Sequence, residues 1–352
     1  MEHFSSSMLA IMEQTDNMHD CYMDNTRQFI LLMLFKVFLN GGALYLCCFK
    51  PLWSFFNICS ISFALVDLSM TAFMTTTLWM DVQSSHVAMC YIMANFSAAY
   101  SALPVPVLCL GILDYYLEDT CAGRKYIRLT RNIVLVILMW LFAGCYALET
   151  ANATLLSQTR NIRYVVCEIK ESRTVGYFTV ALTAVMCIAL LPYMTLIPKW
   201  VKEAERISEE REEIAEARIR DLKIDMTTEE DTKFPIKEFT MPRPPMHLSL
   251  LICFGVFWMP YLAVTTICVT LEFGIPAYIS VNLLWVQCVN SLLEGVVFWL
   301  RSGTVGTYIS QYENICLWQA YWDLSADTND EQLLPVHKFN PSNAKRDMAF
   351  YV

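Results

Sequence analysis

The sequence predicts an all-α membrane protein, a bundle of seven transmembrane helices with its N-terminus outside and its C-terminus inside. The composition, the length of the apolar stretches and the distribution of Lys and Arg lead to this prediction. Of the 352 residues, 56% are hydrophobic and only 17% are charged, whereas about a quarter of the residues of a soluble domain are charged. This composition indicates a multi-pass membrane protein.

Seven stretches are long and apolar enough to form a helix that crosses the hydrocarbon core, which takes roughly 20 residues. They cover residues 28–48, 55–78, 87–117, 133–148, 175–198, 248–271 and 277–300. Because seven is an odd number, we expect the two termini on opposite sides of the membrane.

The Lys and Arg residues near the ends of the spans set the orientation. With the N-terminus outside, the outer segments hold five of these residues and the inner loops hold fifteen, ten of them in the third inner loop. We therefore expect an outer tail (1–27), a helical bundle (28–300) with a charged third cytoplasmic loop (199–246), and a cytoplasmic tail (301–352). Strong helix formers in the third loop predict a solvated helix that extends the fifth span.

The histidines argue against several kinds of chemistry. The chain has five, none of them deep in a span: His3, His19, His86, His247 and His337. A haem site or an intramembrane zinc hydrolase is therefore not supported. The seventh span contains no Lys for a retinal Schiff base, and no phosphate loop or basic stripe for nucleic acid is visible. We expect no enzyme activity, no cofactor, no bound metal cofactor and no nucleic-acid partner.

The sixth predicted span contains a proline with two aromatic residues beside it. In FGVFWMPYL (254–262), Pro260 removes one helical hydrogen bond and bends the helix. Phe254 and Trp258 share a helix face next to this bend. A bulky ring at a kink can couple its rotamer to the swing of the helix, and ordinary packing is the alternative.

Further residues stand at characteristic positions in the other spans: Asn40, Asp67, Cys90, Asp114, Trp140, Pro192 and the pair Asn290-Ser291. Together with the Phe-x-x-x-Trp-x-Pro-Tyr run, they resemble the pattern of rhodopsin-like G-protein-coupled receptors over about 28–300. The resemblance implies a multi-pass plasma-membrane receptor. It also implies an extracellular ligand of unknown identity, a small molecule or a peptide, with heterotrimeric G protein and arrestin as partners.

The resemblance further implies an outer disulfide between Cys90, near the start of the third span, and Cys167 in the second outer loop. The oxidising exterior permits this bond, and two unrelated thiols are the alternative. In the same loop, Asn152-Ala153-Thr154 is a glycosylation acceptor sequence.

The predicted outer tail is too short to be a ligand-binding domain, so we expect a ligand to enter the bundle beneath the second outer loop. Trp258, Tyr261 and Trp285 are the candidates for the floor and wall of its pocket.

The sequence departs from the family at both of its activation motifs. Asp114, Tyr115 and Tyr116 stand in place of Asp-Arg-Tyr, and a Tyr can neither carry a positive charge nor pair bidentately with a carboxylate. In the seventh span, Glu294 and Gly295 replace Asn or Asp and Pro. These departures leave a second function open, that of a receptor-like scaffold or heteromer partner that does not activate G proteins.

The spans contain ionisable residues, which are functional candidates by default inside a membrane. By alignment with the family, Glu294 lies near Asp67 and Asn40, and Lys36 shares a helix face with Asn40. We expect a polar centre or switch of Lys36, Asn40, Asp67, Asn290 and Glu294 that holds an ion pair with a proton or a sodium ion near Asp67 and Glu294. In the alternative, Lys36 extends outward and Glu294 is simply protonated.

Overall fold

The computed structural model describes ten segments of the chain. They are residues 26–47, 54–79, 85–118, 125–151, 157–159, 162–163, 170–224, 242–271, 275–301 and 316–325. Every structural statement below refers to these segments.

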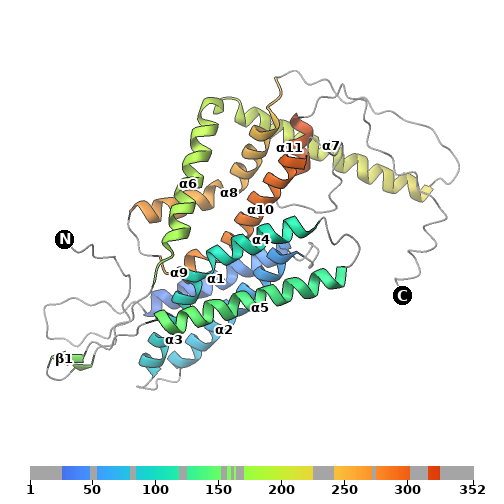
Figure 1. Ribbon diagram of the computed structural model, residues 1–352. Helices are drawn as coiled ribbons and strands as arrows, with labels where there is room; N and C mark the ends of the chain where they lie inside the picture. Colours follow the sequence, from blue (N-terminus) through green and yellow to red (C-terminus); the bar gives the residue numbers. More distant parts are fainter. Residues whose placement is uncertain are drawn as a thin grey trace. The chain divides into compact units, whose positions relative to one another are not determined.

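Helices make up nearly all of the regular structure of the described segments (Figure 1). They are α1 (Thr26–Cys47), α2 (Phe55–Trp79), α3 (Ser85–Ala102), α4 (Pro104–Glu118), α5 (Lys125–Thr150), α6 (Arg173–Leu190), the 3₁₀ turn η2 (Leu191–Tyr193), α7 (Ile197–Ile224), α8 (Met246–Thr270), α9 (Ala277–Ser280), α10 (Leu283–Arg301) and α11 (Trp318–Ser325). Two short antiparallel strands, β1 (Ser157–Thr159) and β2 (Ile162–Arg163), form a hairpin.

The chain divides into two compact units. The first comprises Met1–Pro192, Phe254–Glu294 and Tyr312–Cys316, and the second comprises Tyr193–Cys253, Gly295–Gln311 and Leu317–Val352. In the first unit α2 packs against α1, α3, α4 and α5, and α3 packs against α5 and α9 (Figure 1). In the second unit α11 packs against α7.

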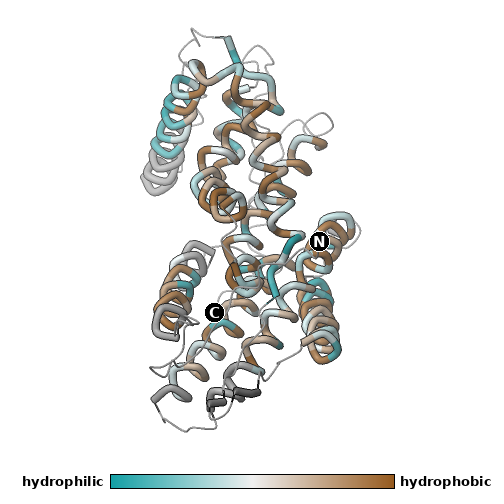
Figure 2. The backbone as a smooth tube through the Cα atoms, turned by 90° about the vertical axis from the view of Figure 1, so that its left-hand side faces the viewer, coloured by the Kyte–Doolittle hydropathy of each residue, from teal (hydrophilic) through white to brown (hydrophobic). Residues whose placement is uncertain are grey.

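Most of the predicted spans are apolar helices in the described structure, as the brown stretches of Figure 2 show. Among the described residues, five helices are long and apolar enough to cross a membrane: Phe55–Thr76, Tyr126–Thr150, Arg173–Tyr193, Met246–Thr270 and Leu283–Leu300. A bent pair of helices makes a sixth if it is one span, and the shorter apolar helix Ile30–Gly42 lies within the first predicted span. The helical membrane fold is thus supported, while the number seven and the orientation stay predictions.

The third predicted span is not one straight helix. It is broken between α3 and α4, and the two parts, Tyr91–Ala102 and Pro104–Leu117, meet at 41°. Pro104 lacks an amide hydrogen and its ring crowds the preceding turn, so the α-helical ladder cannot continue through it. The amide of Leu103 instead donates to the carbonyl of Tyr100 at 3.3 Å, in a tighter turn.

The third inner loop does contain a helix, but this helix does not continue the fifth span. The α-helical part of the fifth span ends at Leu190, and a 3₁₀ turn follows before α7 begins at Ile197. Pro192 explains the interruption, because it cannot donate the hydrogen bond that would extend α6. Pro198 is tolerated because it lies in the first turn of α7, where amides need no helical acceptor.

An aromatic cluster forms the centre of the first unit. The ring of Phe63 on α2 lies 5.4 Å from Tyr100 on α3 and 5.3 Å from Trp140 on α5, measured between centroids. Tyr100 and Trp140 meet edge to face at 5.6 Å, a favourable aromatic geometry. The indole of Trp140 also donates to the Ser62 hydroxyl at 3.0 Å. These contacts fix the relative positions of α2, α3 and α5, which carry or adjoin the polar residues described below.

Gly111 allows α4 to approach the Phe56 ring of α2 closely. A Cβ atom added at Gly111 would lie 2.2 Å from Cζ of Phe56, whose side chain is fully buried. We therefore expect Gly111→Ala to lower the free energy of unfolding by about 1–3 kcal/mol through overpacking. The measurement is the thermal unfolding of the purified chain in detergent. Gly144→Ala is the control, because no atom of the described residues lies within 4 Å of its added Cβ. A loss of stability in both variants alike would contradict the explanation.

Candidate functional site

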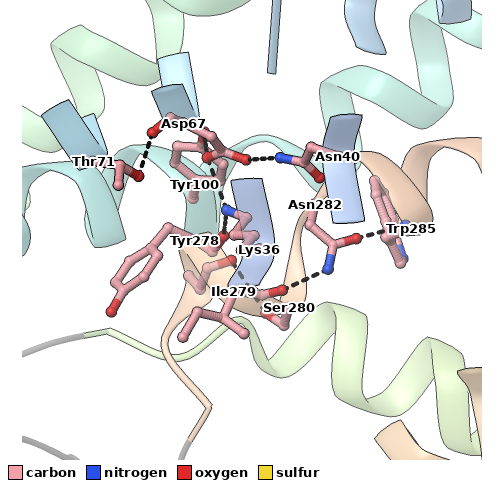
Figure 3. Close-up of polar contacts among 11 residues, drawn as sticks. Lys36, Asn40, Asp67, Thr71, Tyr100, Tyr278, Ile279, Ser280, Asn282 and Trp285 are labelled. Carbon is pink, nitrogen blue, oxygen red and sulfur yellow. Dashed lines mark hydrogen bonds and ion pairs between the residues drawn. The ribbon is translucent and has the colours of Figure 1, made fainter. Parts of the chain in front are cut away.

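Lys36 of α1 lies inside the helical bundle and forms a buried ion pair. Its Nζ lies 2.8 Å from Oδ1 of Asp67 on α2 (Figure 3). The two residues are only 6% and 1% exposed, so Lys36 does not extend outward. The same ammonium group donates to the backbone carbonyl of Tyr278 on α9. One side chain thus links α1, α2 and α9.

Every described contact of the Asp67 carboxylate comes from a hydrogen-bond donor. Besides Lys36, Oδ1 accepts a hydrogen bond from the Tyr100 hydroxyl at 2.8 Å, and Oδ2 accepts one from the Asn40 amide at 2.7 Å (Figure 3). The ammonium also lies 5.2 Å from the centroid of the Tyr100 ring and 5.7 Å from that of Tyr278, within cation–π range. A buried charge is stable only when it is paired and hydrogen-bonded in this way. We call Lys36, Asn40, Asp67 and Tyr100 the Asp67 cluster.

The Asp67 cluster does not fit a sodium ion. Both carboxylate oxygens already accept hydrogen bonds, and the Lys36 ammonium supplies the single positive charge that balances Asp67. A second cation there would be repelled by the ammonium, and no additional carboxylate joins the cluster in the described contacts. The ammonium group of Lys36 therefore takes the place predicted for a sodium ion beside Asp67.

Asn290 and Glu294 belong to a different group of contacts. The hydroxyl of Tyr115 on α4 donates to Oδ1 of Asn290 on α10 at 3.0 Å. The Asn290 amide in turn donates to Oε1 of Glu294 at 2.8 Å, one helical turn further along. We call Tyr115, Asn290 and Glu294 the Glu294 chain. It connects α4 to α10.

In the described contacts, the residues of the predicted polar centre form two separate groups, because α2 and α10 run in opposite directions. Asp67 shares Lys36 with Tyr278, whereas Ser60, two turns earlier on α2, accepts a hydrogen bond from Gln287 at 2.8 Å. Glu294 lies two further turns along α10, away from Asp67. At 1.5 Å per residue, these two carboxylates are separated by about 20 Å along the helices. The polar residues form two clusters at different levels.

Asp114 of α4 is buried and bound by donors from two other helices. Its Oδ1 accepts hydrogen bonds from the Arg131 guanidinium and from the Asn132 amide at 3.1 Å. Its Oδ2 accepts bonds from Arg128 at 3.3 Å and from the backbone amide of Phe55 at 3.0 Å, the first residue of α2. A carboxylate at a helix N-terminus also interacts favourably with the helix dipole. Asp114 thus ties α4 to α2 and α5.

Arg128 and Arg131 are functional residues that the sequence pattern did not predict. Their signal is their place in the short second inner loop and their spacing of three residues, which puts two positive charges on one helix face. Arg128 and Arg131 place positive charge beside Asp114. The family's motif Arg would carry such a charge, and Tyr115 in its place does not. Of the remaining motif residues, Tyr115 is partly buried against Phe56, with 6.3 Å between ring centroids, and Tyr116 is 76% exposed.

The three pocket candidates lie in the first unit on α8 and α10. Trp258 and Trp285 are buried and Tyr261 is partly buried. The rings of Trp258 and Tyr261 meet edge to face at 6.0 Å. Among the described residues, the indole N–H groups of Trp258 and Trp285 have no hydrogen-bond acceptor. Two buried donors of this kind are suited to an acceptor atom of a ligand.

Three predicted sites cannot be placed. Cys167 and Asn152 lie outside the described residues, and so does the side chain of Cys90, although its backbone is part of α3. The disulfide and the glycosylation site stay predictions.

Comparison with known proteins supports a receptor. No protein-family model matches the chain. It is 24% identical over 291 residues to "Probable G-protein coupled receptor 160" of Rattus norvegicus, covering 79% of this chain and 82% of that protein. The proteins of the same name from Mus musculus and Homo sapiens are 25% identical over 281 residues and 24% identical over 286 residues, and each match covers 77% of this chain and 79% of the relative. These matches confirm the resemblance to a G-protein-coupled receptor, a class of protein that is not enzymatic.

Proposed function

We propose that this chain, which is similar over most of its length to a G-protein-coupled receptor, is a rhodopsin-like receptor of the plasma membrane. In this proposal it transmits the binding of an extracellular small molecule or peptide to a heterotrimeric G protein and arrestin. The observation that carries the proposal is the environment of Asp114. Its carboxylate keeps two arginine partners, Arg128 and Arg131, although the neighbouring residue is Tyr115.

The polar contacts fall into two groups that differ in how much energy is needed to break them. The Asp67 cluster joins α1, α2, α3 and α9 through a fully buried ion pair, and removing one member of such a pair costs about 3–5 kcal/mol. The contact between Tyr115 and Asn290 is a single hydrogen bond of neutral groups at 3.0 Å, worth about 0.5–1.5 kcal/mol. Differential binding of a ligand can supply an energy of this size. Movement of α10 relative to α4 is therefore the step that we assign to activation.

The ligand site in this proposal uses the unsatisfied indole groups of α8 and α10. A ligand acceptor that bonds to Trp258 would act beside Pro260, which lies inside α8. A ligand that bonds to Trp285 would act on α10, about two and a half turns before Glu294 and its link to Tyr115. A ligand bound to Trp258 would thus act on α8, which contains Pro260. A ligand bound to Trp285 would act on α10, which the Glu294 chain links to α4.

Removing the Tyr115 hydroxyl tests the proposal. We expect Tyr115→Phe to raise ligand-independent G-protein activation about fivefold at equal surface expression, because a hydrogen bond worth roughly 1 kcal/mol no longer restrains α10. Tyr177→Phe is the matched control, since Tyr177 is exposed on α6 and removing its hydroxyl should leave activation unchanged. Basal G-protein activation and arrestin recruitment are measured in intact cells.

The outcomes separate the proposed function from the scaffold. Activation by the native chain or by Tyr115→Phe supports a signalling receptor. Complete silence of the native chain and both variants, with normal amounts at the cell surface, would speak for a receptor-like scaffold that does not activate G proteins.

A further inference from the structure

The second unit contains a C-terminal helix that is packed against three other helices. One face of α11 is buried, formed by Trp318, Ala320, Tyr321 and Leu324. The helix lies against α7. On α8, the buried Ser249 hydroxyl donates to the backbone carbonyl of Tyr321. The tail therefore returns to the helices that flank the third inner loop.

A contact between α11 and α10 is made possible by a glycine on α10. A Cβ atom added at Gly295 would lie 2.8 Å from Cη2 and 3.2 Å from Cζ2 of Trp318, so the indole ring rests on the helix backbone. An aromatic ring is rigid, and a larger residue at position 295 could not coexist with it in this place. Gly295 stands where the receptor family has Pro, and the sequence of α11 is rich in aromatic residues and contains no Lys, Arg or His. These two departures from the family are structurally compatible, because Gly295 leaves room for the Trp318 ring of α11.

Two local features make the docked position of α11 less stable and favour its release. The Trp318 indole N–H is buried without a hydrogen-bond acceptor in the described part of the chain. Leu317, which immediately precedes the helix, has a φ of 44°, a left-handed conformation that is unfavourable for a residue with a side chain. Burial of the apolar face of α11 stabilises the docked helix and offsets both of these unfavourable features. A segment balanced in this way can be displaced by a competing partner.

We propose that α11 is an autoinhibitory helix, which covers a surface of α7, α8 and α10 and must leave it before a cytosolic partner binds there. In the predicted orientation this surface is inside the cell, since α7 belongs to the third inner loop, α8 begins after that loop, and α10 ends before the cytoplasmic tail. A partner helix that docks at the inner ends of α8 and α10 would compete with Trp318 for the same place. The inference rests on the proposed function, because it requires a transducer.

Two single substitutions release α11 by opposite means, and both are made in the full-length chain. Trp318→Ala removes the ring, and Gly295→Ala fills its place. We expect each to increase amide hydrogen exchange over 318–325 at least tenfold in the purified protein and to raise basal G-protein activation in cells about threefold to tenfold. The double variant should show no further increase, because both changes break one contact. Gly144→Ala, whose added Cβ meets no atom within 4 Å in the described segments, should match the native chain in both measurements.

The results distinguish this inference from the proposed function. Unchanged exchange in Trp318→Ala would show that α11 is not docked, and the inference would fall. Faster exchange without increased activation, in a native chain that couples measurably, would also overturn the inference and leave the proposed receptor function standing. No activation by any chain, including those with α11 released, would overturn both.

Discussion

Lys36→Met is expected to destabilise the protein severely, by about 3–5 kcal/mol, because it leaves the buried Asp67 carboxylate without its counter-charge. Methionine has a similar length and an apolar end, so the change removes the charge with little loss of volume. A loss of this size is a large fraction of the total stability of a typical protein. We expect little of this variant at the cell surface and a strongly lowered unfolding temperature in detergent.

Two control variants test whether the loss of stability in Lys36→Met comes from the broken ion pair. Lys199→Met makes the same substitution at an exposed position of α7 and should change the unfolding temperature little. Adding Asp67→Asn to Lys36→Met removes the orphaned charge, so the double variant should recover most of the lost stability. A double variant no more stable than Lys36→Met alone would show that the charge of Asp67 is not the cause.

Asp114→Ala is expected to have the second largest effect, a loss of about 2–4 kcal/mol together with a change in basal activity. The substitution leaves two guanidinium groups, the Asn132 amide and the Phe55 backbone amide without their shared acceptor. It also removes the polar contacts of Asp114 that link α4 to α2 and α5. The measurements are thermal unfolding of the purified chain and basal G-protein activation at matched surface expression.

Arginine variants refine this test. Arg131→Lys keeps the positive charge but loses the planar fork, so we expect a smaller loss than in Asp114→Ala. Arg131→Ala leaves Arg128 as the remaining cation beside Asp114 and should fall between the two. If Asp114→Ala were as stable as the native chain, the arginines would not replace the missing motif arginine, and the main support for the proposed function would be lost.

The sequence identified the apolar helices well because the requirement is local. A helix that crosses a membrane must be long and apolar, and α2, α5 and α8 satisfy this by their own residues. The place of Pro260 inside α8 also follows from the sequence alone. The breaks beside Pro104 and Pro192 were visible as residues, but we expected continuous spans, since a proline in a membrane helix often bends it without ending it.

The candidate site was predicted only in part, because it depends on which residues of different helices lie at the same level. The sequence singled out Lys36, Asn40 and Asp67 because charge in an apolar span must be paired. It placed Glu294 with them by analogy to the family, whereas the contacts of α10 put it at the level of Tyr115. The partners of Asp114 were missed, since nothing in the sequence shows that α5 turns Arg128 and Arg131 toward α4.

The sequence by itself predicted a bundle of apolar helices with a few costly polar residues inside, and motifs that resemble those of a receptor with altered switches. These properties follow from the hydropathy of each segment and from the cost of an unpaired charge in hydrocarbon. Only the tertiary structure decided that Lys36 neutralises Asp67, that arginines from α5 neutralise Asp114, and that Gly295 receives Trp318 of the tail. The reason is that each of these contacts joins residues from different helices, whose relative depth and rotation are set by packing across the whole bundle.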